Sequence, residues 1–139
     1  MAVFTLTDAF ILINGVTLSD HANQVSVDMA KDEKDFTAFG AVNKVSGKGL
    51  GTGNMQMRFF QDFAIGSVDA TLFPLWGSNT PVTVEVRATS AARSTTNPAY
   101  VMSALMFTYS PLSGEIGEPS QLTAEFKNAS QTGIQRLTS

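Results

Sequence analysis

Apolar and polar side chains alternate with a period of two along most of the sequence. Alternation of this kind is typical of β-strands that bury one face and expose the other. We predict strands at Phe10–Asn14, Val16–Leu18, Gln24–Met29, Asn54–Gln61, Pro81–Thr89, Ala99–Tyr109 and Gln121–Lys127, and a further strand or arm at Ile134–Thr138. The Asn14-Gly15 dipeptide predicts a tight turn between the first two of these strands.

One segment replaces the alternation with helical spacing. Its apolar residues are Val68, Leu72, Leu75 and Trp76. Ser67 precedes them and suits the N-cap of a helix. Pro74 lacks a backbone N–H and clashes with the preceding turn, so we expect the helix to end or kink near Phe73. We predict a short α-helix over about residues 67-76, whose apolar side covers an opening of a β-sandwich or barrel.

Two stretches show no regular period, and the longer of them is Lys31–Gly53. It begins with clustered charges and ends rich in glycine. The residues that stand out are Lys31, Asp32, Glu33, Lys34, Asp35, Lys44, Lys48, Gly49, Gly51 and Gly53. A structureless segment of this length is unusual in a compact domain unless it is functional. We therefore expect a long, flexible and functional loop (31-53), and a shorter loop at Ser90–Asn97.

The predicted strands Asn54–Gln61 and Ala99–Tyr109 are long enough for their edges to matter. In a monomer we expect both strands to expose unpaired backbone groups, which invites aggregation. Closure of several copies into a ring would pair these edges. The pattern therefore favours an assembly over an isolated β domain.

Charge and length narrow the class of protein further. The chain has the 139 residues of one domain, only 15% of them charged, and a formal net charge of −3. This balance argues against tight nucleic-acid binding, which relies on Lys and Arg to displace counterions from phosphates. It does not argue against a protein that DNA slides past, because a mildly acidic surface repels phosphates and does not trap them. The start has no leader pattern, and no apolar stretch approaches the ~20 residues of a membrane helix. We expect a soluble protein made in a cytoplasm, without a membrane partner.

No group of residues in the sequence points to catalysis, a metal or a cofactor. The chain has no cysteine, which excludes disulfides, thiol catalysis and Cys-based zinc sites. Its single histidine, His21, follows Asp20, and we interpret it as a hydrogen-bonded or solvated loop residue. The carboxylates at 32–35 lack the spacing of a calcium loop. The glycines at 49–53 precede a predicted strand, whereas a phosphate-binding loop precedes a helix. We expect no enzyme activity.

Several stretches resemble tail tube proteins, also called major tail proteins, of siphophages. They are Ile13–His21, Gln61–Phe63, Gly66–Gly77, Val82–Arg93 and Asn97–Tyr100, in the family's order. The helix that ends in Leu-Phe-Pro-Leu and the following Val-Thr-Val-Glu-Val-Arg strand are the most typical parts. One departure is Ala88, where the family pattern has proline. The motifs are structural, so it is their ordered set that carries the resemblance.

The resemblance implies a mainly β fold, a β-sandwich or barrel of antiparallel strands with one helix, and residues 1-139 as a single tail-tube domain. Six subunits would form a ring, with about four strands each in a continuous inner barrel. About 24 strands exceed the 16–18 that already leave an aqueous channel. The segment 31-53 would be the extended inter-ring loop. The protein would be a structural virion protein of the tail tube, assembled in the host cytoplasm.

The same resemblance implies the partners. They are further copies of the chain, the tape-measure, tail terminator and distal tail proteins, and double-stranded DNA that passes without specific binding. Polar rows that could face the channel are Gln24, Ser26 and Asp28; Thr83, Glu85 and Arg87; and Thr123, Glu125 and Lys127. Two other classes remain open. A tube protein of a contractile injection system would share the architecture, and a monomeric ligand-binding β-barrel would enclose an apolar cavity.

Overall fold

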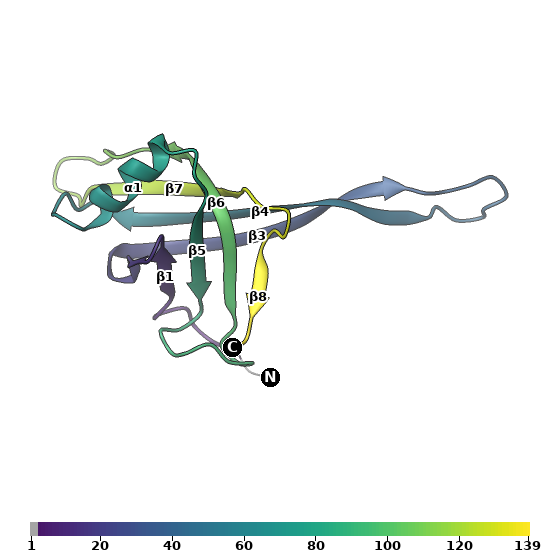
Figure 1. Ribbon diagram of the computed structural model, residues 1–139, viewed down its shortest axis with the longest axis horizontal. Coiled ribbons are helices and arrows are strands. Elements are labelled where there is room, and N and C mark those ends of the chain that lie inside the picture. The colour runs from purple at the N-terminus through teal and green to yellow at the C-terminus, as the bar shows by residue number, and fades with distance from the viewer. Residues whose placement is uncertain (1–2) are drawn as a thin grey trace.

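The computed structural model describes residues 3–139 and is mainly β, with antiparallel strands and one α-helix in that range (Figure 1). The elements are β1 (Phe10–Ile13), β2 (Val16–Thr17), a 3-10 turn (Ser19–His21), β3 (Ala22–Asp35), β4 (Ser46–Phe60), α1 (Val68–Gly77), β5 (Val82–Arg87), β6 (Ala99–Tyr109), β7 (Gln121–Asn128) and β8 (Gln135–Leu137). Each strand predicted from alternation is present. The mainly β fold class is therefore confirmed.

The strands form one bent sheet in the order β2-β1-β5-β6-β7-β4-β3, and β8 pairs with β6. The sheet does not close into a barrel but folds over in a sandwich-like way. In Figure 1 the strands β3, β4 and β7 run across β1, β5 and β6, as in an orthogonal packing of two layers. β6 joins the layers, because it pairs with β5 over residues 99–104 and with β7 over residues 104–109.

The core lies between the layers and consists of the inward members of the alternating rows. It includes Ile11, Ile13, Met55, Met57, Phe59, Val84, Met102, Leu122 and Phe126, each no more than 2% exposed. Where one strand contributes several of these residues they are two or four positions apart, which is the spacing that places side chains on one face of a sheet. Burial of this apolar surface is the main source of the fold's stability.

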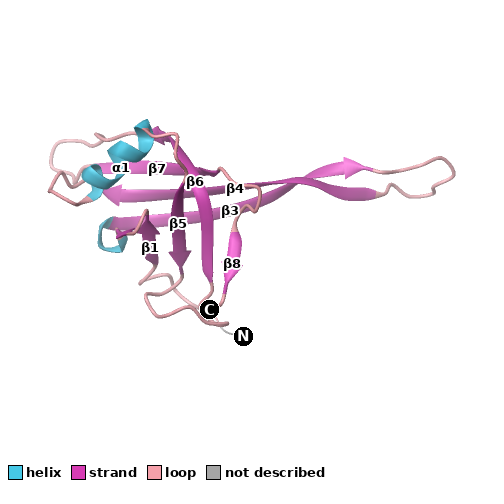
Figure 2. Ribbon diagram, in the orientation of Figure 1, coloured by secondary structure: helices cyan, strands magenta, loops and turns pink. Residues whose placement is uncertain are grey.

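The helix α1 follows Ser67, which occupies the N-cap position as predicted, although its hydroxyl does not bind a backbone N–H. Val68, Leu72 and Leu75 are buried, and α1 packs mainly against β6. Figure 2 shows the helix at one end of the sandwich. The prediction of a short helix with an apolar side facing the sheet is confirmed.

The helix matches the predicted bounds of about 67-76 to within one residue at each end. It continues through Pro74 to Gly77, so of the two outcomes expected near Phe73 the end of the helix is wrong. Proline removes a single backbone hydrogen bond here, to the carbonyl of Ala70, and the packed face of a short helix offsets that loss. Trp76 was expected on the apolar side, but it is 52% exposed and stacks on Phe73, with 6.3 Å between ring centroids.

The prediction of a flexible loop at 31-53 is also wrong, because most of this segment belongs to two long strands. β3 and β4 pair from Ala22↔Phe59 out to Asp35↔Ser46, and only residues 36–45 form a loop at the tip. Figure 1 shows this β-hairpin reaching far beyond the sandwich. We call residues 31–53 the arm. Backbone hydrogen bonds hold its strands together, so the pairing does not require the alternation that its sequence lacks.

The strand edges expected from the sequence hold only in part. The expected edge of Asn54–Gln61 is wrong, because this part of β4 pairs with β3 on one side and with β7 on the other. In β6, β5 covers only Ala99–Ala104, so the expected edge is present only after Ala104. Within residues 3–139 β3 pairs only with β4, which leaves its other edge open. Among the residues that the structure describes, none pairs with the part of β6 beyond Ala104 on the side of β5. Alternation identifies the faces of a strand but not its neighbours, which is why the edges could not be assigned from the sequence.

A polar face, an arm and a polar anchor as the candidate assembly site

Three strands place nine polar side chains on one face of the sheet. Across β3, β4 and β7 the register aligns Gln24 with Arg58 and Thr123, Ser26 with Gln56 and Glu125, and Asp28 with Asn54 and Lys127. The intervening residues of β4 and β7 point into the core, so these nine residues point away from it. We call this grid the polar face. It unites two of the predicted rows, while the middle row, from β4, was not among the candidates.

The charges of the polar face balance. Asp28 and Glu125 oppose Arg58 and Lys127, and the Lys127 ammonium lies 3.9 Å from a carboxylate oxygen of Glu125. The Ser26 hydroxyl donates a hydrogen bond of 3.0 Å to Asp28. The Lys127 side chain is 58% exposed, so its ion pair with Glu125 contributes little to stability. Such a surface offers phosphates no cluster of positive charge to bind.

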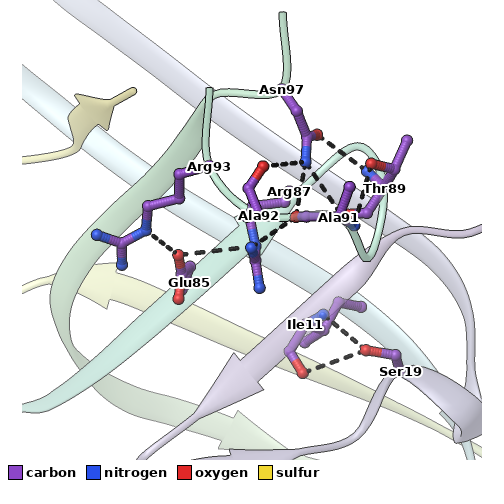
Figure 3. Close-up of polar contacts among 9 residues, drawn as sticks. All are labelled: Ile11, Ser19, Glu85, Arg87, Thr89, Ala91, Ala92, Arg93 and Asn97. Atoms are coloured by element: carbon purple, nitrogen blue, oxygen red, sulfur yellow. Dashed lines mark hydrogen bonds and ion pairs between the residues drawn. The ribbon is translucent and has the colours of Figure 1, made fainter. Parts of the chain in front are cut away.

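The third predicted row, on β5, lies elsewhere. Thr83, Glu85 and Arg87 belong to the other layer, and Glu85 is only 5% exposed. The Arg93 guanidinium donates a hydrogen bond of 2.7 Å to Glu85 (Figure 3). Arg87 donates to the carbonyl of Ala91 at 2.7 Å and lies 3.9 Å from the ring centroid of Phe10. Glu85 and Arg87 therefore anchor the loop after β5 and do not belong to the polar face.

Asn97 completes this anchor at the end of the predicted loop Ser90–Asn97. Its side chain is 6% exposed, and its amide nitrogen donates to the carbonyl of Ala91 at 2.9 Å. Its amide oxygen accepts a hydrogen bond of 3.2 Å from the backbone N–H of Thr89 (Figure 3). Asn97 thus satisfies backbone groups that regular pairing leaves free. The sequence showed it only as part of an Asn-Pro pair in a polar loop.

His21 is a hydrogen-bonded residue, as interpreted from the sequence, but one of its partners is distant in the chain. Its Nδ1 lies 2.9 Å from Asp20, and its Nε2 lies 2.9 Å from Asp62. The hydroxyl of Ser67 donates to the same Asp62 oxygen at 2.7 Å. Serine therefore contacts the carboxylate and not the imidazole, whereas activation of a nucleophile needs a serine–histidine contact.

These contacts shift the ionisation of both partners. The hydrogen bond to Asp20, assisted by Asp62, raises the pKa of His21 above its usual value. The hydrogen bonds from Ser67, Ala64 and His21 lower the pKa of Asp62. The His21 imidazole consequently links the 3-10 turn before β3 to the loop before α1, which is a structural role.

Tyr109 makes a second link to α1. Its hydroxyl donates a hydrogen bond of 2.7 Å to Asp69, in the first turn of the helix. Burial, with the nearby Asp69 carboxylate contributing, raises the pKa of Tyr109 to about 12. The hydrogen bond between Tyr109 and Asp69 therefore holds α1 against the last residues of β6, which extend past β5.

Within residues 3–139 no group of three or more His, Asp or Glu side chains is arranged to hold a metal ion. In the same range no helix has the length and apolar character needed to cross a bilayer.

A groove of about 1040 Å³ runs between the arm and residues 128–134, outside the core. Gly53 borders the groove, where a Cβ atom would come within 2.9 Å of Ile134. Glycine at 53 therefore lets the C-terminal segment pack against the base of the arm.

The same fold occurs in solved structures of tails and injection systems. One is a chain from the virion of a native gene transfer agent particle, with a TM-score of 0.71 and 8% identity over 93% of this chain and 95% of that chain. Another comes from the tail of an empty gene transfer agent particle, which has C6 symmetry, with a TM-score of 0.66 and 7% identity over 86% and 83%. A third comes from a sheath–tube complex of an extracellular contractile injection system, with a TM-score of 0.72 and 12% identity over 99% and 93%.

This chain shares its fold with components of those assemblies. At such identities the likeness is one of fold, and the fold is the one that the resemblance to tail tube proteins implied. No protein-family model and no curated protein matches the sequence. The structural neighbours therefore carry the comparison.

Proposed function

We propose that this protein is a non-enzymatic, structural subunit of a tail tube, and that its copies form hexameric rings that stack around a channel for a viral genome. The observation that carries the proposal is the polar face, which lies between two open edges, that of β3 and that of β6 after Ala104. The fold shared with tail and tube components supports it. The C6 symmetry of the neighbouring gene transfer agent tail supports the number six.

The open edges suit ring closure. One is the edge of β3, and the other is the part of β6 after Ala104. Between them lie β4 and β7, so one copy offers four strands, β3-β4-β7-β6, to a shared barrel. Pairing of β3 with β6 of the next copy would extend the antiparallel ladder and leave no edge. Six copies would give a barrel of about 24 strands, which is wide enough for an open lumen.

The polar face would line this lumen. Its side chains are polar and its charges cancel, so a DNA duplex would meet neither strong attraction nor large apolar patches. Such a lining fits a conduit better than a binding site. The protein would lie in the tail of the virion and be assembled in the host cytoplasm. Tape-measure, tail terminator and distal tail proteins would be its partners.

The arm would join successive rings. It extends beyond the sandwich, and its pairing as a β-hairpin makes it stiffer than the loop predicted from the sequence. The tube of a contractile injection system is the second candidate function, because the sheath–tube neighbour matches the fold equally well. The arm and polar face would have the same roles in both assemblies.

Negative-stain electron microscopy of purified protein at increasing concentration tests the proposal. We expect sixfold rings that elongate into tubes. Protein that stays monomeric at high concentration would contradict the proposal, and a ligand held in the core would favour the ligand-binding barrel. Co-purification of a sheath protein, after expression with its neighbouring genes, would favour the contractile system over the non-contractile tail.

Because the chain has no cysteine, a single introduced thiol reports on the channel. Gln56→Cys places the thiol at the centre of the polar face. In assembled tubes we expect it to react with a small maleimide but not with a maleimide coupled to a protein too large to enter the channel. Thr80→Cys, in the exposed loop between α1 and β5, is the matched control and should react with both. Equal reaction of the two variants with the large reagent would place the polar face outside the tube.

A further inference from the structure

Apolar side chains are fully exposed at both ends of the molecule's long axis. At the tip of the arm, Phe39 and Val42 are 110% and 96% exposed. At the opposite end, Ile65 and Ile116 are 104% and 105% exposed. Figure 1 shows the tip at one end and α1, with the loops that flank it in space, at the other. Clustered exposed apolar residues mark interaction sites on soluble proteins.

Charged side chains of opposite sign lie beside these apolar residues. The tip loop, residues 36–45, contains Lys44 and no acidic residue, and Lys48 follows it on β4, across the hairpin from Glu33 on β3. Residues 110–120, in the loop after β6, contain Glu115 and Glu118 but no basic residue. The two lysines and these two glutamates form no ion pair within residues 3–139. The tip thus presents apolar side chains beside Lys44 and Lys48, and the opposite end presents them beside Glu115 and Glu118.

The acidic loop has a defined shape. The backbone N–H of Glu118 donates to the carbonyl of Glu115 at 3.1 Å, and that of Gln121 donates to Ser113 at 3.0 Å. Gly117 has a φ of 85°, which glycine adopts without steric cost in a tight turn. This turn holds Ile116 outward between the two glutamates. The surface is therefore preformed, which lowers the entropy cost of binding.

We propose that the arm tip of one copy docks on the opposite end of a second copy, formed by residues 61–67 and 110–120. Phe39 and Val42 pack there against Ile65 and Ile116, and Lys44 and Lys48 lie opposite Glu115 and Glu118. The inference rests on the proposed tube function and identifies the surface that receives the arm. A second copy is the occupant because each chain carries both complementary surfaces. A contact between unlike ends repeats without closing, and so builds a stack.

Charge reversal with rescue tests the inference. Glu115→Lys with Glu118→Lys makes both ends basic, and Lys44→Glu with Lys48→Glu makes both acidic. Like charges placed across an interface oppose association, so we expect each double variant to form rings, with a critical concentration for tube growth raised about tenfold or more. The quadruple variant exchanges the signs, keeps the wild-type net charge and should regain tubes. Sedimentation of tubes and electron microscopy of rings give the two readouts.

The outcomes separate the two proposals. If Glu115→Lys with Glu118→Lys grows tubes at the wild-type critical concentration, the docking surface is wrong while the tube function stands. If both double variants fail and the quadruple variant, folded by circular dichroism, fails too, charge pairing between these ends is also refuted. Wild-type protein that forms neither rings nor tubes would overturn the proposed function, and this inference with it.

Discussion

Phe126 lies where three strands meet, and its replacement by alanine tests the core of the sandwich. Its register partners are Met55 on β4 and Met106 on β6. The exposed fractions of Phe126, Met55 and Met106 are 0%, 0% and 4%. Phe126→Ala therefore leaves a cavity at the junction of the layers, and loss of a buried phenylalanine side chain costs about 3–5 kcal/mol. This is a large part of the ~5–15 kcal/mol that stabilises a typical domain.

Urea unfolding followed by circular dichroism, at protein concentrations too low for assembly, measures this loss. A thermal melt gives a second measure, because a domain of this size should lose roughly 4 °C in Tm for each kcal/mol lost from the free energy of unfolding. The matched control is Phe107→Ala, because Phe107 is 60% exposed on the same strand as Met106. Its free energy of unfolding should change by no more than about 0.5 kcal/mol. Equal losses in the two variants would refute the assignment of the core.

Three further predictions concern the arm and the polar links. Replacement of 31–53 by a two-residue turn should leave the fold and the rings intact but abolish tubes, and long tubes in electron micrographs would show that the arm does not join rings. Because the pKa of His21 is raised from 6.5, its pairing should stabilise the fold fully below about pH 6.5, and this contribution should be lost as pH rises through the folded-state pKa. Thermal melts from pH 5 to 9 should show Tm falling with rising pH in the wild type and falling much less in Asp62→Asn. Identical profiles of Tm against pH in the two proteins would contradict the link between His21 and Asp62. Arg93→Ala removes the guanidinium that lies 2.7 Å from buried Glu85, and it should lower the free energy of unfolding by about 1–3 kcal/mol in urea titrations. Adding Glu85→Gln should restore part of this loss. An unchanged free energy of unfolding in Arg93→Ala would contradict the role given to this contact.

Much of the fold could be predicted because strand faces are a local property. A row such as Met55, Met57 and Phe59 is visible in the sequence, and the structure buries it. The short helix was visible for the same reason, since its apolar spacing changes to that of a helix. Trp76 shares this spacing but lies exposed, because the sheet contacts only part of the helix surface. Local pattern gives the faces of an element but not the extent of its contacts.

The arm was missed because backbone pairing, and not side-chain alternation, holds it. Its glycines contribute no side chain to either face, and side chains from other segments lie where their Cβ atoms would be. A Cβ at Gly49 would lie 3.0 Å from the side chain of Lys34, and one at Gly47 would collide with the ring of Phe36. Such contacts cross the hairpin, so they depend on a register that the sequence does not display.

The candidate site was predicted in part for a similar reason. The rows on β3 and β7 were found as polar alternations, but only the strand order brings them together beside Gln56 and Arg58. The row on β5 has the same alternation, yet the loop that follows it buries Glu85. A polar row is therefore exposed or buried according to distant segments of chain. Asp62, the distant partner of His21, was hidden in the same way.

Cryo-electron microscopy of tubes assembled from the purified protein tests the central claim most directly. We predict stacked sixfold rings around an open channel, with the polar face on the channel wall and β3 of each copy paired with β6 of the next. A reconstruction in which the polar face lies on the outer surface, or in which β3 keeps an open edge, would contradict the account.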